Sequence, residues 1–576
     1  MNRSSLCLEI GTIAYLSMDV AIDSDIPTYS GGLGILAGDM LRSAADLEMP
    51  MVAISLLHRK GYFDQRLDTS GNQLESPSNW APENRLGPVP ERTSVVVEGR
   101  NVSLRAWKYL FRGVTGHTVP LLLLDTDVEG NDPRDRALTD HLYGGDEHYR
   151  LCQEAILGFG GLAMLRALGY SDVHVFHMNE GHSAFITVAL LEERAGMHFR
   201  ERVSETDVQA VRRRCVFTTH TPVPAGHDRF PAALISQVLG ERRAALLEHI
   251  GAVNGDLNMT GLALRLSRYA NGVSLRHGQV SRAMFPEYNI DAITNGVHAA
   301  AWTSAPFCAL YDRVIPEWRR DNCYLRYAIG IPRQEIRQAH AKAKKDLFQQ
   351  VRWLTGIQLD PAIFTLGFAR RATAYKRGDL LFTSLERLKR IAHSVGPLQL
   401  IYAGKAHPRD EGGKAVIRRI FEAAAALAND VRVVYLENYD MALGKLICSG
   451  VDLWLNTPLR PQEASGTSGM KAALNGVPSF SVLDGWWIEG HIEGVTGWSI
   501  EGTDGKDNDT EAEVHSLYDK FEQIILPLFS QDPDSFTQVM RSAIAINGSF
   551  FTTQRMMFQY TRNAYTVGAD SGAPLP

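Results

Sequence analysis

Short apolar runs alternate with longer amphipathic segments through the second half of the chain. The runs have the length and β-branched content of buried strands, and they lie at 363–368, 399–403, 431–436, 452–455 and 479–483. Apolar residues at helical spacing predict helices at 334–353, 380–393, 414–427, 441–447 and 470–474. This alternation predicts a doubly wound parallel sheet, which binds ligands beyond the carboxyl ends of its strands.

The first half repeats this pattern with one interruption. Strands are predicted at 13–20, 50–57, 172–176, 215–219 and 290–293, and helices at 35–47 and 147–168. The runs at 94–97, 101–111 and 118–124 are rich in β-formers, so we expect antiparallel strands at the rim of the first domain, with Glu98-Gly99 as a turn. Further helices are predicted at 514–529, 535–545 and 550–565.

Composition narrows the class of protein. A chain of 576 residues is long enough for several domains or for two large α/β domains. The net charge of −6 gives no reason to expect a nucleic-acid or membrane partner, so an anionic substrate needs a local basic cluster. The six cysteines contain no CxxC pair, which indicates reduced thiols and no zinc site. Since no apolar run is long enough to span a bilayer, we expect a cytoplasmic enzyme.

The segment EASGTSGMK, residues 463–471, concentrates small and hydroxyl side chains before a predicted helix. Small residues let a backbone approach a ligand closely, and free N–H groups at a helix start suit a phosphate. Lys471 would lie in the first turn, where the helix dipole disfavours a cation. The lysine therefore either reaches into solvent or is covalently modified; the plainer interpretation of the segment is an ordinary glycine-rich loop.

Polar side chains also follow several other predicted strands. RRATAYKR, residues 370–377, places four cations before a helix, which favours a bound anion over a solvated basic turn. HMNEGH at 177–182, HTPVPAG at 220–226 and TNGVH at 294–298 follow strands of the first half. Each could instead consist of helix caps, turns and core histidines. The glycine turn GGLG at 31–34 is a weak phosphate signal by itself.

Taken together, these segments resemble the α-glucan (glycogen, starch, maltodextrin) phosphorylase family, as a short bacterial or archaeal type of member. EASGTSGMKAALNGVPSFSVLDG resembles its pyridoxal-phosphate lysine motif, and RRATAYKR its K-R-x-x-x-Y-K-R motif. GGLG, HTPVP, TNGV…W, GKAHP, ENY and LDGWWIE also resemble family segments, in family order. Departures include Arg370 for lysine, Glu180 for aspartate, Asp440 for arginine and Asp19 for glutamate.

The resemblance implies roles for individual residues. Roles in catalysis are implied for Lys471, Arg371, Lys376 and His220. Cofactor contacts are implied for Lys471, Gly466, Thr467, Tyr439, Gly31, Gly32, Trp302 and Arg370. Substrate contacts are implied for His220, Thr221, Asn295, Tyr375, Glu463, Ala464, Ser465, Gly466 and Glu180, and no metal is implied.

The implied fold is α/β, with two Rossmann-like domains facing across a cleft, the GT-B type of glycosyltransferase architecture. We expect the first domain at 1–308, the second at 309–548 with the cofactor and phosphate site, a helix at 549–567 crossing back to the first domain, and a flexible tail at 568–576.

The implied reaction is reversible phosphorolysis of the terminal glucose of an α-1,4-glucan or maltodextrin to α-glucose 1-phosphate, with retention. The partners would be the glucan, inorganic phosphate, glucose 1-phosphate and a second copy in a homodimer. In the family, the 5′-phosphate of pyridoxal phosphate exchanges a proton with the substrate phosphate. Because the first strand motif comes almost at once, we expect no nucleotide allostery and no phosphoserine switch.

Two alternatives stay open. A nucleotide-sugar glucosyltransferase would share the architecture without pyridoxal phosphate, but such enzymes place lysine where Ser30 stands. An inactive glycan-binding homologue would keep the fold without catalysis, although Lys471, Arg371 and Lys376 are all present.

Overall fold

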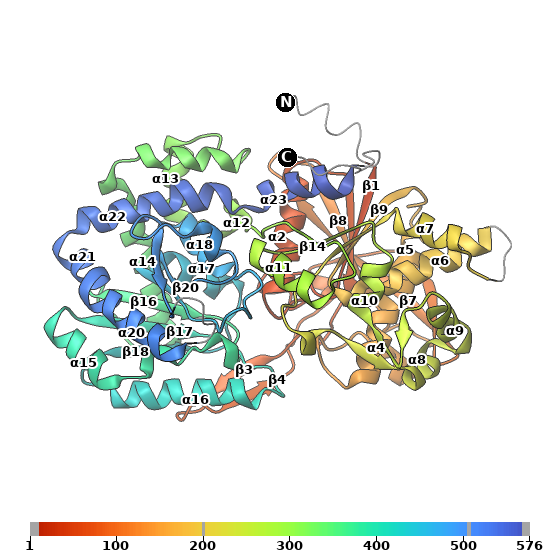
Figure 1. The fold of residues 1–576 in the computed structure, drawn as a ribbon, viewed down its shortest axis with the longest axis horizontal. Helices are drawn as coiled ribbons and strands as arrows, with labels where there is room; N and C mark the ends of the chain where they lie inside the picture. Colours follow the sequence, from red (N-terminus) through yellow and green to blue (C-terminus); the bar gives the residue numbers. More distant parts are fainter. Residues whose placement is uncertain (1–10, 198–201, 504–508, 567–576) are drawn as a thin grey trace.

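The computed structural model describes residues 11–197, 202–503 and 509–566. Two mainly parallel β-sheets, each covered by helices, form the body of the molecule (Figure 1). The first sheet is built from residues before 293 and the second from residues after 363. The prediction of an α/β protein with parallel sheets is therefore confirmed.

The first sheet has the strand order β15-β14-β10-β9-β1-β2-β8-β7-β5, with β6 paired to β7. Its strands are β1 (Thr12–Ser17), β2 (Met51–Leu56), β5 (Gly87–Pro88), β6 (Thr93–Val97), β7 (Arg100–Arg112), β8 (Thr118–Asp125), β9 (Val173–Asn179), β10 (Cys215–Thr218), β14 (Tyr269–Gly272) and β15 (Asp291–Ala292). The strands from β15 to β8 are parallel. The predicted antiparallel strands are β6, β7 and β8; β7 pairs antiparallel with β8 and with β6, whereas β8 also pairs parallel with β2, and β5 is an additional antiparallel strand. A separate small sheet joins β11 (Arg229–Pro231), β12 (Val253–Asn254) and β13 (Asp256–Asn258).

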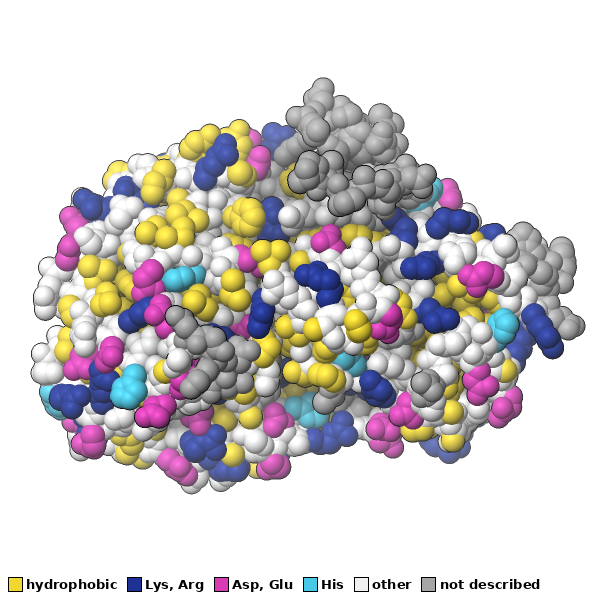
Figure 2. All heavy atoms as spheres, viewed as in Figure 1, with side chains coloured by type: hydrophobic (Ala, Val, Ile, Leu, Met, Phe, Trp, Pro, Cys, Tyr) yellow, Lys and Arg dark blue, Asp and Glu magenta, His cyan; other side chains and the backbone are white. Residues whose placement is uncertain are grey.

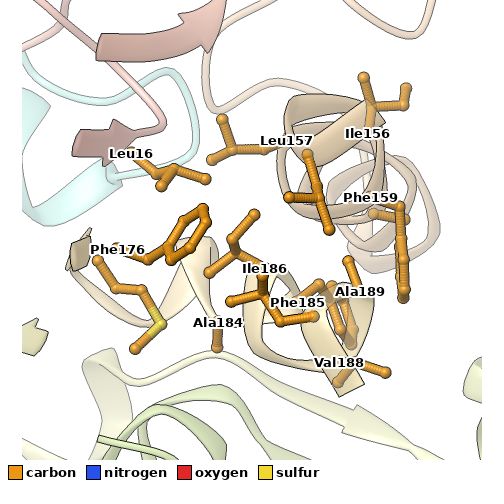
Figure 3. Packing of buried hydrophobic residues seen from close by; sticks show 14 of the residues in the cluster. Leu16, Ile156, Leu157, Phe159, Phe176, Ala184, Phe185, Ile186, Val188 and Ala189 are labelled. Carbon is orange, nitrogen blue, oxygen red and sulfur yellow. The ribbon is translucent and has the colours of Figure 1, made fainter. Parts of the chain in front are cut away.

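Alternate residues of the central strands face two different helix layers, as the period of two requires. Leu16 and Phe176 pack with Leu157 and Ile186 on one face (Figure 3). Ile13 and Tyr15 belong to the cluster on the other face. The helices of the first-sheet region are α2 (Gly32–Asp46), α3 (Pro133–Arg136), α4 (Glu147–Ala155), α5 (Gly161–Ala167), α6 (Phe185–Met197), α7 (Glu205–Arg212), α8 (Ala232–Leu239), α9 (Glu241–His249), α10 (Met259–Arg265) and α11 (Leu275–Met284). The next two helices, α12 (Ala299–Trp302) and α13 (Ala305–Val314), pack in the core cluster of the second sheet.

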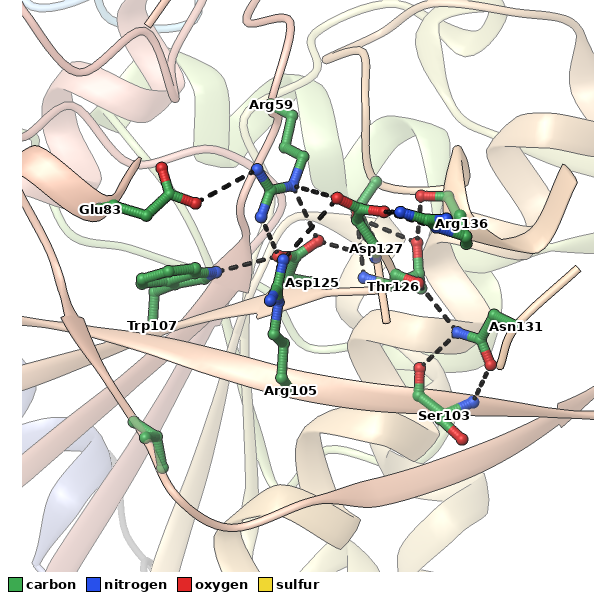
Figure 4. Close-up of polar contacts among 12 residues, drawn as sticks. Arg59, Glu83, Ser103, Arg105, Trp107, Asp125, Thr126, Asp127, Asn131 and Arg136 are labelled. Carbon is green, nitrogen blue, oxygen red and sulfur yellow. Dashed lines mark hydrogen bonds and ion pairs between the residues drawn. The ribbon is translucent and has the colours of Figure 1, made fainter. Parts of the chain in front are cut away.

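A buried aspartate fixes the antiparallel edge. Asp125, at the end of β8, accepts hydrogen bonds from Arg59 at 2.6 Å, Arg105 at 2.8 Å and Trp107 at 2.9 Å (Figure 4). Burial raises the pKa of Asp125, but its hydrogen bonds, that from Arg59 foremost, lower the pKa by more, so the carboxyl stays ionised. Removing one of these partners would leave the buried carboxylate partly unpaired, which is strongly destabilising.

The second sheet is parallel throughout and has the order β18-β17-β16-β19-β20-β21. Its strands are β16 (Phe364–Ala369), β17 (Leu398–Ala403), β18 (Arg432–Leu436), β19 (Leu453–Asn456), β20 (Ser479–Val482) and β21 (Gly497–Ile500). Its helices are α14 (Arg333–Thr355), α15 (Leu385–Ser394), α16 (Glu411–Ala426), α17 (Met441–Gly450), α18 (Ser468–Leu474), α19 (Trp487–Gly490), α20 (Thr510–Lys520), α21 (Leu526–Gln531) and α22 (Pro533–Ser542). The predicted doubly wound sheet is confirmed, and β21 is an additional strand.

Several predicted boundaries are wrong, and three of them lie next to the loops at the strand ends. The first strand ends at Ser17 rather than at Val20, because the chain turns there toward the glycine segment. The helix predicted from residue 380 begins at Leu385, after a separate 3-10 turn at Leu380–Phe382. The helix predicted from Met470 begins at Ser468.

Two segments pass between the sheet regions. A hairpin of β3 (Asp64–Leu67) and β4 (Gln73–Ser76), which the sequence analysis missed, leaves the first-sheet region and contacts the loops after β17 and β18. In the opposite direction, α23 (Thr553–Tyr560) joins the cluster that contains Ile13 and Tyr15. Figure 1 shows both: β3 and β4 lie beside α16, and α23 lies beside α2.

On the face drawn in Figure 2, acidic and basic side chains are interspersed, with no large area of one sign. No helix within the described residues is both long and apolar enough to cross a membrane. The cysteines that the structure describes are all free thiols. The predicted flexible tail at 568–576 lies outside the described residues.

Candidate active site

Lys471 lies one turn into α18, and its side chain is buried. Its Nζ is 3.7 Å from the centroid of the Trp302 ring, and no described residue gives it a hydrogen bond or an ion pair. Burial lowers the pKa of Lys471, while Cys448 and Asp39 oppose this and Arg370 adds to it. A buried amine with a lowered pKa and no acidic partner has the properties of a nucleophilic lysine.

The Trp302 ring beneath Lys471 is held at its edge by a hydrogen bond from the indole N–H. Its Nε1 donates a hydrogen bond of 2.6 Å to Oδ2 of Asp39, a buried residue of α2. The same oxygen accepts the backbone N–H of His298 at 3.1 Å. The position of the lysine therefore depends on a carboxylate in the first-sheet region.

Glu463 pairs with two of the four cations of the basic segment after β16. Its Oε2 lies 2.7 Å from Arg370 and 2.6 Å from Lys376, and all three side chains are buried. Burial raises the pKa of Glu463, but Arg370 and Lys376 bring it down to about 2. The cluster keeps one net positive charge, and Lys376 has further N–H donors to offer.

Arg371 differs from its three basic neighbours. Arg377 pairs with Glu513 at 2.6 Å, whereas no described carboxylate pairs with Arg371. Burial lowers the pKa of Arg371, but the phenols Tyr375, Tyr62 and Tyr143 raise it by more. An arginine that faces hydroxyl groups keeps its planar fork free for an anion such as phosphate.

The loop before Lys471 carries an unsatisfied hydroxyl. Oγ of Ser465 is buried and has no hydrogen-bond partner in the structure, and buried polar atoms are seldom left so. Gly466 has φ +81°, a conformation that favours glycine. The carbonyl of Ala464 accepts a 2.6 Å hydrogen bond from Ser274, which joins this loop to the first-sheet region.

The polar ends of β9 and β10 brace one another. Oε2 of Glu180 accepts the backbone N–H of His220 at 2.7 Å and the hydroxyl of Thr221 at 3.0 Å. The ring of His220 shares a 2.7 Å hydrogen bond with Oδ1 of Asn179. Burial, with smaller contributions from His277 and His177, lowers the pKa of His220 to about 3, so the ring is neutral at physiological pH.

Asn295 presents a second unsatisfied group. Its backbone N–H donates to the carbonyl of Val273 at 3.0 Å, next to the Ser274 that contacts Ala464. Its side-chain Oδ1 is buried and has no partner. The residues flanking Ser274 and Ala464 thus include two buried oxygens without partners, those of Asn295 and Ser465.

The remaining predicted residues surround these groups. Gly31 caps α2 and Gly32 begins it, and a side chain at either would meet no atom within 4 Å, so there is room for a ligand. Burial raises the pKa of Tyr439, and Arg370 is among the charges that act on it. Of the two departures noted in the sequence, Asp440 caps α17 by accepting from Leu443 at 2.8 Å. Asp19 accepts a 3.2 Å hydrogen bond from the hydroxyl of Tyr143.

The sequence analysis did not find Asp39, Tyr62, Tyr143 or Arg555, which contact or support these groups, and it noted Glu489 only as part of the segment LDGWWIE, without a role. Of the first four, only Asp39 has a sequence signal, since an aspartate beside the predicted apolar face of helix 35–47 needs a buried partner. The other three acquire their neighbours through tertiary contacts.

The fold and the site define an α/β protein that gathers a buried lysine with a lowered pKa, an arginine with no described carboxylate partner and buried polar groups without described partners near the carboxyl ends of parallel strands. Residues 240–496 match the family described as carbohydrate phosphorylase. The maltodextrin phosphorylase of Thermococcus litoralis is 39% identical over 96% of this chain and 70% of its own length. The glycogen phosphorylases of Mycobacterium tuberculosis and Aquifex aeolicus are 37% and 34% identical, over 97% and 96% of this chain and 71% and 86% of their own lengths. The chain belongs to the carbohydrate phosphorylase family.

Proposed function

We propose that this protein is an α-glucan phosphorylase that uses pyridoxal phosphate bound to Lys471. It transfers the terminal glucose of an α-1,4-glucan or maltodextrin to inorganic phosphate, giving α-glucose 1-phosphate with retention. The observation that carries the proposal is the environment of Lys471, whose amine is buried, lies over Trp302 and has no described acidic partner.

The residues present fit pyridoxal phosphate. An aldehyde needs a neutral amine, and burial lowers the pKa of Lys471. The Trp302 ring and the space beside Gly31 and Gly32 suit a flat aromatic group and its phosphate. When bound, the cofactor supplies a phosphate that exchanges a proton with the substrate phosphate. Gly466, Thr467, Tyr439 and Arg370 complete the proposed cofactor contacts.

Arg371 and Lys376 are the proposed ligands of the substrate phosphate. Arg371 offers a planar fork, and Lys376 is held 2.6 Å from Glu463 with donors to spare. Arg370 and Lys376 together carry one more charge than Glu463 neutralises, and Arg371 adds another. The resulting positive site stabilises negative charge that develops on phosphate.

The sugar is proposed to bind at the polar groups that the structure leaves unsatisfied. Ser465 and Asn295 each offer a buried oxygen without a partner. His220 is neutral and its Nε2 donates to Oδ1 of Asn179, so its Nδ1 can accept a hydrogen bond from the sugar without placing a charge beside a developing oxocarbenium ion. Thr221, Tyr375, Glu463, Ala464, Gly466 and Glu180 are the other proposed substrate contacts.

We further propose that the two sheets belong to two Rossmann-like domains, 1–308 and 309–548, that face across a cleft, with 549–567 crossing back. The contacts of Lys471 with Trp302 and of Ser274 with Ala464 support a shared site between them. A homodimer acting in the cytoplasm completes the proposal.

One experiment tests cofactor and reaction together. The purified protein is supplied with pyridoxal phosphate, reduced with borohydride and digested, and the labelled peptide is identified. We expect the label on Lys471 and none on Lys445, a second lysine whose pKa burial lowers. The same preparation should release glucose 1-phosphate from maltoheptaose only when phosphate is present. Absence of both the label and phosphate-dependent release, with transfer from a nucleotide sugar instead, would contradict the proposal.

A further inference from the structure

The segment DGWWIE, residues 484–489, contacts the loops on both sides of the proposed sugar site. On one side, Oδ2 of Asp484 accepts the backbone N–H of Glu463 at 2.9 Å, and the backbone N–H of Trp486 donates to the carbonyl of Ser465 at 2.9 Å. Gly485 between them has φ +56°, and a side chain there would meet the Ser465 carbonyl oxygen at 2.4 Å. This half of the segment therefore holds the loop that carries Ser465.

The other end of the segment reaches the first-sheet region. Oε2 of Glu489 accepts the hydroxyl of Thr294 at 2.6 Å, and Oε1 accepts the backbone N–H of Leu275 at 2.9 Å. Thr294 precedes Asn295, and Leu275 follows the Ser274 that contacts Ala464. One carboxylate thus joins the two strand-end segments that border the unsatisfied amide of Asn295.

Arg555 of α23 holds the same turn through its backbone. Its guanidinium donates 2.6 Å and 2.9 Å hydrogen bonds to the carbonyls of Thr294 and Asn295. Gly296 packs closely against the residue that precedes α23. A side chain at Gly296 would meet the backbone of Thr552 at 2.2 Å. The carboxylate of Glu489 and the guanidinium of Arg555 already make these hydrogen bonds within the protein. We therefore do not expect either side chain to bind the sugar directly.

We propose that Glu489 and Arg555 are positioning residues for the sugar, which act by fixing the Thr294–Asn295 turn so that the Asn295 side chain meets a glucose hydroxyl. This inference rests on the proposed function. Asp484 and Trp486 fix Ser465 from the same segment, so DGWWIE sets the distance between the two sugar-binding loops. In this proposal the segment positions the two loops. Its two tryptophans are both buried, so they act as core residues.

The test compares wild type with Arg555→Met and Glu489→Gln, using the full-length protein loaded with pyridoxal phosphate. Gln554→Met is the matched control, because Gln554 neighbours Arg555 on α23 but bonds Asn322 and Arg320 instead of the turn. We expect the KM for glucose 1-phosphate to rise roughly threefold to tenfold in both test variants, the effect of losing about one hydrogen bond. The KM for phosphate and the absorbance of the bound cofactor should stay at the values of the control.

A double-mutant cycle with Asn295→Ala separates positioning from general damage. If Arg555 acts through Asn295, Arg555→Met should add nothing to the KM for glucose 1-phosphate once Asn295 is alanine. An undiminished effect in that background, or a KM no higher than in Gln554→Met, would overturn the inference while wild-type phosphorolysis still stands. Wild type that releases no glucose 1-phosphate would overturn the proposed function itself. Glu489→Gln serves alone if Arg555→Met does not fold.

Discussion

Asp39 shows how one buried carboxylate can adjust the reactivity of a lysine in a distant part of the chain. It holds Trp302 by a 2.6 Å hydrogen bond, and its charge opposes the effect of burial on the pKa of Lys471. In Asp39→Asn this opposing charge is absent, so the pKa of Lys471 should fall further. We expect the pH midpoint for labelling Lys471 with an amine reagent, in cofactor-free protein, to move to lower pH.

Asp46→Asn is the control for this prediction. Asp46 lies further along the same helix and pairs with His298 at 2.8 Å, so the substitution changes net charge equally. It is not among the groups that act on Lys471. Equal midpoints in the two variants would show that Asp39 has no specific influence on the lysine.

Asp19 gives a prediction for pH. Burial raises its pKa from 3.8 to about 7, although hydrogen bonds from Ser30, Tyr143 and Gly34 oppose this. Between pH 3.8 and about 7, Asp19 therefore holds a proton in the folded protein that it releases in the unfolded chain. The contribution of Asp19 to the free energy of unfolding is fully present below pH 3.8 and is lost as pH rises to about 7.

Asp19→Asn should remove this pH dependence. Between pH 5 and 7, the free energy of unfolding of wild type should decline relative to the variant by about 3 kcal/mol at most, since one pKa unit corresponds to about 1.4 kcal/mol. Urea unfolding at several pH values measures the difference. Asp25→Asn, at an exposed aspartate, should show no such slope. A constant difference between wild type and Asp19→Asn would contradict the raised pKa.

For single residues, the sequence was most informative where several functional side chains lie close together in one short motif. Lys471, Arg371 and Ser465 were assigned from short segments, and the structure shows them with the environments described above. It could not assign Glu489 or Arg555, because their partner Thr294 lies about 200 residues or more away in the chain. An ordinary surface Glu or Arg has the same local sequence properties.

Among the elements, the β3–β4 hairpin contacts the second-sheet region through paired hydrogen bonds from a side chain to the backbone. Oε1 of Gln73 accepts the N–H of Ala406 at 2.9 Å, and its Nε2 donates to the Ala406 carbonyl at 2.9 Å. Gln73→Leu would leave both backbone groups of Ala406 without their partner. We expect a loss of about 3 kcal/mol in the free energy of unfolding, since each unsatisfied buried group costs about 1–3 kcal/mol.

Hydrogen exchange locates this effect. The Ala406 amide should exchange much faster in Gln73→Leu, and amides of β21, at the far edge of the second sheet, should change only with the global stability. Asn72→Ala is the control, because Asn72 bonds Asp68 within the exposed hairpin turn. Equal protection of Ala406 in the two variants would contradict the role given to Gln73.

The hairpin also shows why some elements escaped prediction. Its strands, DQRL and QLES, have no apolar period, and the buried side chains of Gln65 and Gln73 bond backbone groups of the second-sheet region. By contrast, strands such as β17 are buried at every position and read as continuous apolar runs. The pattern of hydrophobic positions therefore predicted both parallel sheets but not the segment that passes between them.

At the scale of the whole molecule, the two sheet regions exchange elements in both directions. The β3–β4 hairpin places Gln65 and Gln73 against Gly404 and Ala406 of the second-sheet region. In return, α23 and the turn after it place Met557 and Tyr565 in the cluster of β1, and the hydroxyl of Tyr565 lies 2.7 Å from His177. Neither region can unfold without exposing part of the other.

This exchange predicts that the molecule unfolds as one cooperative unit. Met557→Ala removes volume from the first-sheet cluster, and Met540→Ala removes the same volume from the second-sheet cluster. Each should cost about 2–5 kcal/mol. If the regions unfold together, each variant lowers the protection of the slowest-exchanging amides equally in the two strands, β1 and β16. Native-state hydrogen exchange measures this. If instead Met557→Ala weakens only β1 and Met540→Ala only β16, the regions unfold independently, and the exchanged segments serve the geometry of the site rather than the stability of the whole.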